Sequence, residues 1–228
     1  MKKTILLVTL MTTCAGPKLP DVAEQKKPVE IQAQPPEPVV VEEVDTADDC
    51  SEALTGPAVP PGSKVLLMGD SLAVGMTPAF KTAAKSSGYV PVAYAKVGST
   101  TFHWRSRLGQ ILSSEKPALV VVSLGTNDAP AYDKVKTQPD MYKDFVEQVQ
   151  AAGAFVVWIG PPAIKETRVP RINDIREMLL KTTPIYFDSR SLDLTLTDGI
   201  HTTPEDYAYW MGQIWHWMSH TMIVKDFE

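Results

Sequence analysis

A serine and a histidine that could work as a nucleophile and its base lie 130 residues apart in this sequence. Ser71 is in the tetrapeptide GDSL at 69–72, directly after the apolar run 65–68, and His201 ends the tetrapeptide DGIH at 198–201. A serine hydroxyl is a weak nucleophile near neutral pH unless an imidazole accepts its proton and a third group orients that imidazole. The chemistry that these residue types predict is attack on an acyl group by Ser71.

The choice of histidine follows from its neighbours. The sequence holds His103, His201, His216 and His220. Only His201 has a carboxylate at short fixed spacing within a turn-like segment that contains glycine, namely Asp198. We therefore expect His201 to be the base and Asp198 to orient its ring.

The elements that must position these residues follow from the apolar pattern after residue 62. The continuous apolar runs 119–122 and 155–159 are typical of central parallel strands covered on both faces. Their alternation with helical patterns predicts an α/β fold, a three-layer α/β/α doubly wound sandwich with a five-stranded parallel sheet. The predicted strands are 64–68, 90–95, 118–124, 154–159 and 184–187, and the predicted helices between them are 79–87, 102–114, 141–152 and 172–181.

The polar segments 69–71, 97–99 and 125–128 each come directly after a predicted strand. Open α/β sheets place their sites at the carboxyl ends of the strands, so we expect these segments to meet at one edge. Thr203 and Pro204 have the character of an N-cap and a first helical residue, which places His201 just before a last helix.

Four short blocks in this order resemble the SGNH hydrolases of the GDSL esterase and lipase superfamily, over residues 62–222. The blocks are GDSL at 69–72, a glycine at 98, GTND at 125–128 and DGIH at 198–201. The resemblance implies that Ser71 is the nucleophile, that His201 is general base and then acid, and that Asp198 orients it. It also implies an oxyanion hole formed by the backbone amides of Ser71 and Gly98 and the side-chain amide of Asn127, where fixed donors stabilise the developing negative charge.

The resemblance further implies a flavodoxin-like strand order, 2-1-3-4-5, and no metal or organic cofactor. One local feature is Pro78, because proline inside a helix removes a hydrogen bond and clashes with the preceding turn. We expect a short turn after Ser71 and a new helix that begins at Pro78.

The N-terminal segment 1–15 has the pattern of an export signal. Two lysines precede the apolar run 5–11, which is too short to span a bilayer as a helix. Cys14 stands where a lipoprotein signal carries the cysteine that is acylated. Cleavage after Ala15 and an uncleaved anchor are the alternatives, and each predicts an exported protein in the periplasm or cell envelope, anchored in the membrane if Cys14 is lipidated.

Residues 16–61 read as a disordered tether before the domain 62–228. The tether contains nine of the nineteen prolines and ten acidic residues against three lysines, so the domain itself is close to neutral. No basic stripe favours a nucleic-acid partner. Cys50, the second of the two cysteines, lies in the tether, where it could pair between chains or be a chance linker residue.

Several other residues have two interpretations. Trp104 and Arg105 could line the cleft and contact a sugar and an anionic group, or lie on a helix surface beside it. The loop 160–170, with Lys165 and Arg168, is a candidate specificity loop. The pair formed by His216 and His220 could offer two imidazoles to a metal but lacks a third ligand, which favours a surface role. We expect the apolar residues of the last helix to pack on the sheet: Trp210, Met211, Ile214, Trp217 and Met218.

The predicted activity is that of a serine esterase acting through an acyl-enzyme on a small-molecule or glycan ester. An exported, tethered domain without a long apolar insertion favours an O-acetyl esterase on cell-envelope carbohydrate. A lysophospholipase, a thioesterase, an arylesterase and an O-acetyltransferase would use the same site. The alternative of another class is a non-catalytic envelope-binding module that keeps the fold.

Overall fold

The structure, a computed structural model, describes residues 58–130, 138–221 and 223–225. The predicted signal and most of the tether, with Cys14 and Cys50, lie outside the described residues. Within the described ranges, no helix has both the length and the apolar character needed to cross a membrane.

Five parallel strands form one sheet in the order β2-β1-β3-β4-β5. This is the 2-1-3-4-5 order that the resemblance to the SGNH hydrolases implies. The strand bounds differ from the predicted ones by a few residues at most. The strands are β1 (Lys64–Gly69), β2 (Val90–Ala95), β3 (Leu119–Ser123), β4 (Phe155–Ile159) and β5 (Tyr186–Phe187).

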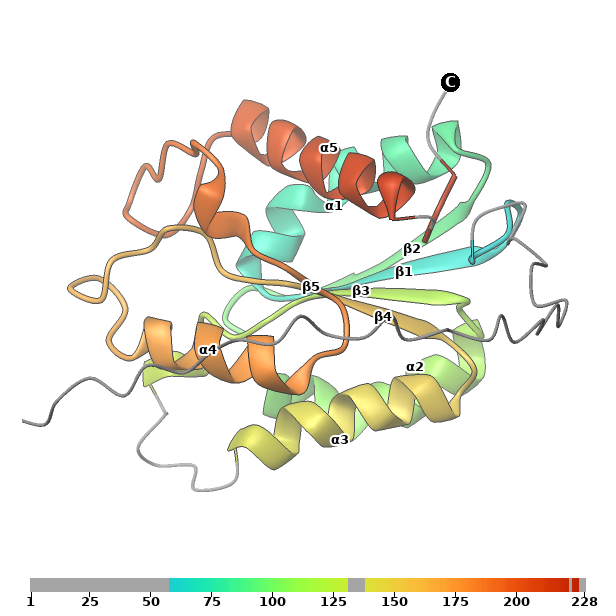
Figure 1. Ribbon diagram of the computed structural model, residues 1–228, viewed down its shortest axis with the longest axis horizontal. Helices are drawn as coiled ribbons and strands as arrows, with labels where there is room; N and C mark the ends of the chain where they lie inside the picture. Colours follow the sequence, from blue (N-terminus) through green and yellow to red (C-terminus); the bar gives the residue numbers. More distant parts are fainter. Residues whose placement is uncertain (1–57, 131–137, 222, 226–228) are drawn as a thin grey trace, which may run out of the picture. The chain divides into compact units, whose positions relative to one another are not determined.

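Helices cover both faces of the sheet, which confirms the three-layer architecture (Figure 1). One layer consists of α1 (Ser71–Ser86) and α5 (Pro204–His220). The other layer consists of α2 (Thr101–Glu115), α3 (Gln138–Ala151) and α4 (Ile172–Thr182).

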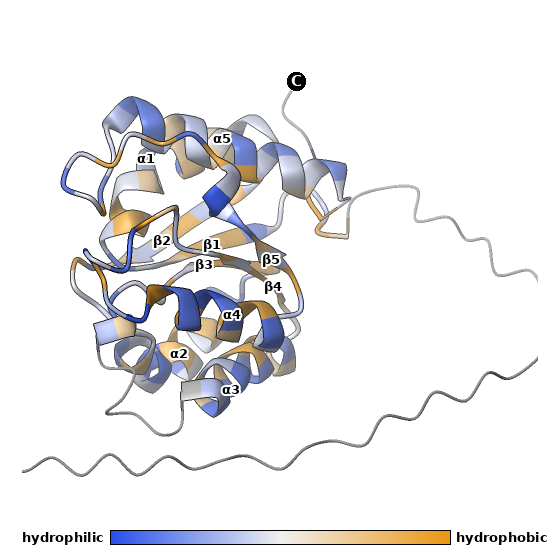
Figure 2. Cartoon of the chain, turned by 60° about the vertical axis from the view of Figure 1, so that its left-hand side comes forward, coloured by the Kyte–Doolittle hydropathy of each residue, from blue (hydrophilic) through white to orange (hydrophobic). Residues whose placement is uncertain are grey.

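The alternation of side chains along the strands divides the core into two halves. In β3, Leu119 and Val121 pack toward α1 and α5, whereas Val120 and Val122 pack toward the α2, α3 and α4 layer. All five residues of β3 are buried, as expected for a central strand with helices on both faces. Figure 2 shows hydrophobic residues along the strands between the two helix layers.

The last helix begins and packs as the sequence predicts. Thr203 caps α5 by accepting a hydrogen bond from the N–H of Asp206, and Pro204 is the first helical residue. Trp210, Met211, Ile214 and Met218 are buried on the sheet side, and Trp217 is partly buried. Trp215 is also fully buried and packs edge-on against Phe80 and Tyr89.

The expected break at Pro78 is wrong, because α1 runs without interruption from Ser71 to Ser86. Asp70 caps the start of the helix, and Met76 and Phe80 are buried on either side of the proline. Pro78 and Val74 are both exposed, so water can bind to the carbonyl group that the missing N–H leaves free. Packing on both sides therefore outweighs the local penalty of the proline.

The folded domain extends at least to Val59, three residues before the predicted boundary at 62. Val59 is fully buried in the core half beneath α1 and α5. Its N–H donates to the carbonyl of Ile223 at 2.9 Å, and its carbonyl accepts from the Tyr89 hydroxyl at 2.8 Å. The segment before β1 is thus part of the packed structure.

Candidate active site

Ser71, His201 and Asp198 meet at the carboxyl edge of the sheet. Ser71 is the first residue of α1, directly after β1, and His201 lies in the loop that leads into α5. The Oγ of Ser71 is 2.8 Å from Nε2 of His201, and Nδ1 of His201 is 2.8 Å from Oδ2 of Asp198. The side chain of His201 is 40% exposed, so a substrate can reach the pair from solvent.

The turn that carries Asp198 and His201 fixes the direction of the proton relay. Oδ1 of Asp198 accepts the backbone N–H groups of Ile200 at 2.9 Å and of His201 at 2.8 Å. These bonds, together with the bond to the His201 ring, hold the pKa of Asp198 well below its usual range. An ionised Asp198 favours a proton on Nδ1 of His201, which leaves Nε2 to accept the Ser71 proton.

Gly98 lies in a tight turn after β2, with φ of +73°. The next residue, Ser99, donates from Oγ to the carbonyl of Gly69 at 3.1 Å and accepts from the indole N–H of Trp104 at 2.8 Å. Trp104 is 5% exposed, so both interpretations of it from the sequence, a cleft residue that stacks on a sugar and a residue on the helix surface, are wrong. Its indole instead fixes the backbone beside Gly98.

Asn127 lies against both of the segments that carry the other predicted oxyanion donors. Its Nδ2 donates to the carbonyl of Ser99 at 2.9 Å and is 3.4 Å from Oδ2 of Asp70. Asp70 and Ser99 directly adjoin Ser71 and Gly98 in the chain. The structure therefore brings Asn127 together with the two predicted backbone donors, and the oxyanion role of all three stays a prediction.

Asp128, the residue after Asn127, is buried and connects the loop after β3 to two helices. Its carboxylate accepts the backbone N–H of Thr101 at 3.0 Å, the hydroxyl of Thr101 at 2.6 Å and the hydroxyl of Tyr142 at 2.9 Å. These bonds join the loop after β3 to the start of α2 and to α3. The sequence showed Asp128 only as the end of a motif, because its partners come from distant parts of the chain.

Asp70 is a second buried carboxyl group next to the nucleophile. It is 1% exposed, and its Oδ1 accepts the N–H of Leu72 at 2.9 Å. Burial raises the pKa of Asp70 to about 7, and the neighbouring charge of Asp128 acts in the same direction. Asp70, which directly precedes Ser71 in the chain, therefore changes its charge near neutral pH.

Two other sequence candidates have partners away from the triad. Arg105 forms an ion pair with Asp144, which joins α2 to α3. Its guanidinium group is therefore paired within the protein and not directed at an anionic group of a substrate. The rings of His216 and His220 lie 3.9 Å apart between centroids, and Nδ1 of His220 contacts the carbonyl of His216. The described part of the chain holds no cluster of three or more His, Cys, Asp or Glu side chains that could bind a metal ion.

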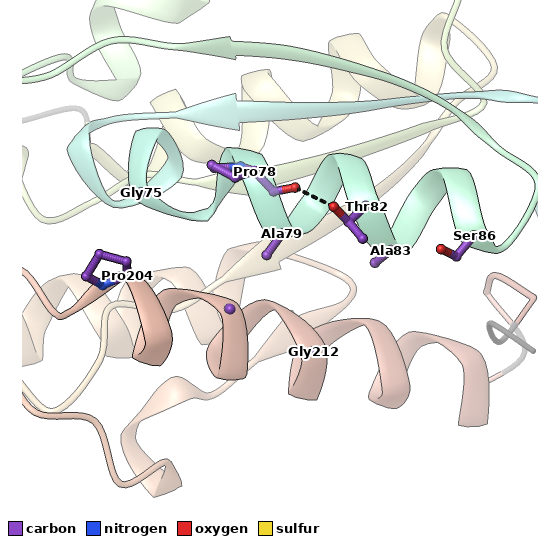
Figure 3. A pocket seen from close by; sticks show the side chains of 9 residues that line it. Gly75, Pro78, Ala79, Thr82, Ala83, Ser86, Pro204 and Gly212 are labelled. Carbon is purple, nitrogen blue, oxygen red and sulfur yellow. Dashed lines mark hydrogen bonds between the residues drawn. The ribbon is translucent and has the colours of Figure 1, made fainter.

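An apolar groove of about 500 Å³ runs between α1 and α5 (Figure 3). Gly75 lines it one helical turn after Ser71, and Pro204 lines it three residues after His201. The groove therefore begins near the helix ends that carry the triad and leads away along both helices. Its other lining residues are small or weakly polar: Pro78, Ala79, Thr82, Ala83, Ser86, Ala208 and Gly212.

A family model described as "Protein of unknown function (DUF459)" matches residues 64–190. The chain belongs to the DUF459 family. The matched segment includes Ser71, Gly98 and Asn127 and ends before Asp198 and His201. None of the curated proteins compared with this DUF459 chain matches it.

Solved structures similar to this DUF459 chain confirm the α/β fold of the SGNH hydrolases. A psychrotrophic esterase from Pseudoalteromonas sp. has a TM-score of 0.57 at 18% identity, with 70% of this chain and 98% of that chain covered. A lipase/acylhydrolase from Enterococcus faecalis has a TM-score of 0.57 at 19% identity, with coverages of 73% and 99%. A mutant of an acetylxylan esterase from Geobacillus stearothermophilus has a TM-score of 0.53 at 14% identity, with coverages of 68% and 94%.

Proposed function

We propose that this protein is a serine esterase that removes short acyl groups, above all O-acetyl groups, from carbohydrate of the cell envelope. The observation that carries the esterase activity is the hydrogen-bonded chain from Ser71 through His201 to Asp198, with 2.8 Å at each step. This is the arrangement that turns a serine hydroxyl into a nucleophile.

The reaction follows from this geometry in two halves. Ser71 Oγ attacks the ester carbonyl carbon while Nε2 of His201 takes its proton, and the negative charge on the carbonyl oxygen is met by the amides of Ser71, Gly98 and Asn127. His201 then gives the proton to the leaving alcohol oxygen as the carbon–oxygen bond breaks. In the second half, His201 deprotonates a water molecule that attacks the acyl-enzyme, and Ser71 is released with its proton restored.

The choice of a short acyl group on a glycan has two supports. The predicted export signal and tether would carry the domain to the cell envelope, where acylated polysaccharides occur, either free or anchored through Cys14. One of the similar folds belongs to an enzyme that acts on acetylated xylan.

The groove between α1 and α5 favours a second candidate, an esterase for longer acyl chains. The groove is apolar and begins one turn beyond Ser71, as a site for a fatty acyl chain would require. A lysophospholipase or thioesterase would use it, whereas an acetyl esterase would leave it empty. The two candidates therefore predict opposite dependence of the rate on acyl length.

The experiment is hydrolysis of p-nitrophenyl acetate, butyrate and octanoate by the parent and by Ser71→Ala. We expect kcat/KM to fall with acyl length and Ser71→Ala to lower it by about a thousandfold or more, since the nucleophile is removed. Ser113→Ala, at an exposed serine of α2, is the matched control and should keep full activity. Rates that rise with acyl length would favour the groove and a lipid substrate.

Two further outcomes separate the remaining classes. Full activity of Ser71→Ala would reject Ser71 as the nucleophile. Serine-dependent transfer of acetyl to an added glycan acceptor, in preference to water, would identify an O-acetyltransferase. Rates of the parent no higher than those of Ser71→Ala on every ester and acceptor would support a binding module.

A further inference from the structure

The loop after β4 is held in place at the same edge of the sheet as the triad. In Figure 1 this loop and the loop before α5 both lie on the left of the molecule. Arg176 of α4 is 4% exposed and points its guanidinium at the loop. The guanidinium donates to the carbonyls of Pro161 at 3.3 Å, Pro162 and Ile164 at 3.2 Å. Three carbonyl acceptors on one buried cation give this loop a defined shape.

Arg168 extends from this loop onto the turn that carries His201. A Cβ atom placed on Gly199 would lie 3.1 Å from Cγ, 3.4 Å from Cδ and 3.6 Å from Nε of Arg168. Gly199 has φ of +83°, so both its backbone conformation and the closeness of Arg168 favour glycine there. The stem of Arg168 is thus packed two residues from His201, while the residue as a whole is exposed.

The guanidinium group of Arg168 forms no ion pair within the part of the chain that the structure describes. Arg105, Arg171 and Arg190 each form an ion pair with an aspartate, whereas no ion pair of Arg168 occurs among the described residues. Asp198 is held by hydrogen bonds from its own turn, so Arg168 is not needed to orient it.

We propose that Arg168 is a specificity-determining residue that binds an anionic oxygen group, a carboxylate or a phosphate, on the alcohol part of the substrate ester. This inference rests on the proposed esterase function and deepens it. His201 gives its proton to the leaving oxygen, so the alcohol part must lie on the side of the His201 turn. An acetyl group carries no charge, which leaves the alcohol part as the source of an anion.

The physical basis is the fork of the guanidinium group, which matches the two oxygens of a carboxylate or phosphate. The packed stem on Gly199 and the fixed loop beneath it reduce the conformational freedom that an exposed arginine would otherwise lose on binding. The substrate class that follows is an acylated acidic glycan or a phosphate-bearing glycan, in preference to a neutral one.

The test compares matched esters that differ in one charge. 4-Acetoxybenzoate carries a carboxylate on the alcohol part, its methyl ester is the neutral partner, and 4-acetoxyphenyl phosphate supplies the phosphate arm. We expect Arg168→Gln to raise KM for the anionic esters about fivefold or more, with kcat and the rate on the methyl ester nearly unchanged. The KM of Arg168→Lys for the anionic esters should lie between those of the parent and of Arg168→Gln, because lysine keeps the charge but lacks the forked guanidinium group.

Lys165→Gln is the matched control, because Lys165 is an exposed cation of the same loop, whereas the three atoms nearest to a Cβ on Gly199 all belong to Arg168. It should leave the ratio of anionic to neutral rates unchanged. The arm with the larger effect of Arg168→Gln, carboxylate or phosphate, identifies the group that is bound.

Three results would overturn the inference. An equal loss on charged and neutral esters would make Arg168 a structural residue of the turn. Unchanged KM values of Arg168→Gln for both kinds of ester would show that Arg168 does not contact the substrate. An equal rise in KM for the anionic esters in Lys165→Gln would show a general effect of positive charge and no specific role of Arg168. Serine-dependent hydrolysis of the neutral ester tests the proposed function separately, and its absence would overturn both proposals.

Discussion

The pKa values of two carboxyl groups at the site, Asp198 of the triad and Asp70 beside the nucleophile, are shifted in opposite directions. Asp198 is partly exposed and accepts two backbone N–H bonds, so it stays ionised and can orient His201. Asp70 is buried and accepts one, at Leu72, so desolvation prevails and its pKa rises to about 7. The same residue type therefore has two electrostatic roles within one site.

The raised pKa of Asp70 leads us to expect that the free energy of unfolding falls as the pH rises. Its pKa of about 7 in the folded state lies above the ordinary aspartate value of 3.8, so the folded state binds this proton more tightly than the unfolded state does. The contribution is fully present below pH 3.8 and is lost as the pH rises through about 7. Asp70→Asn cannot ionise, so its free energy of unfolding should fall less between pH 5 and pH 8, by about 2 kcal/mol.

Urea unfolding of the parent and of Asp70→Asn at the two pH values measures this difference. Asparagine is also a good N-cap, so the start of α1 should be kept in the variant. Asp140→Asn, at an exposed acid in the first turn of α3, is the control and should follow the parent. Parallel pH profiles for the parent and Asp70→Asn would show that Asp70 does not titrate in this range.

At the scale of elements, the sequence predicted those features that follow from local patterns. Apolar runs identified β3 and β4, and the capping residues Thr203 and Pro204 identified the start of α5. Pro78 was misjudged because packing of Met76 and Phe80 on the sheet, which holds α1 together across the proline, is a tertiary effect.

Side-chain placement within the site was less accessible to sequence reasoning. The sequence identified Ser71, His201 and Asp198 because each stands in a short motif. Trp104 was placed wrongly, since its indole partners lie before and after β2 in the chain and are adjacent only in the fold. The roles of Asp128 and Arg176 depend likewise on contacts between separate elements.

The glycines of the α1–α5 pair predict opposite effects of adding one methyl group. A Cβ on Gly75 would lie 2.4 Å from the ring of Tyr207, which is stacked on Trp210 and has little room to move. A Cβ on Gly212 would meet no atom within 4 Å. Gly75→Ala should destabilise the fold by about 1 to 3 kcal/mol, and Gly212→Ala should stabilise it by about 0.5 to 1 kcal/mol.

Thermal or urea unfolding of both variants tests this pair. Gly109→Ala, in the exposed face of α2, is the reference for helix propensity alone, because its Cβ would also lie in open space. It should match Gly212→Ala. Destabilisation by Gly212→Ala would mean that α1 and α5 pack more closely than the structure has them.

At the scale of the whole molecule, the two ends of the domain are joined at one point. The hydroxyl of Tyr89 donates to the carbonyl of Val59 at 2.8 Å and accepts the N–H of Lys225 at 2.7 Å. Val59 also donates to Ile223. The segment before β1 and the segment after α5 therefore stabilise each other, on top of the core that they cover.

A chain that begins at residue 62 should consequently be less stable than one that begins at residue 58. The shorter chain loses the burial of Val59, worth about 1.5 to 3 kcal/mol. It also leaves the hydroxyl of Tyr89 without the carbonyl to which it donates, and the carbonyl of Ile223 without the N–H of Val59. Urea unfolding should give a lower midpoint for the chain from 62, and the midpoint of Val59→Ala in the longer chain should lie between the two.

Because the triad lies at the carboxyl ends of the strands and Val59 precedes β1, esterase rates at urea concentrations below the unfolding range should be the same for all three proteins. Equal midpoints would place the boundary of the cooperative unit after Val59, at the position that the sequence predicted.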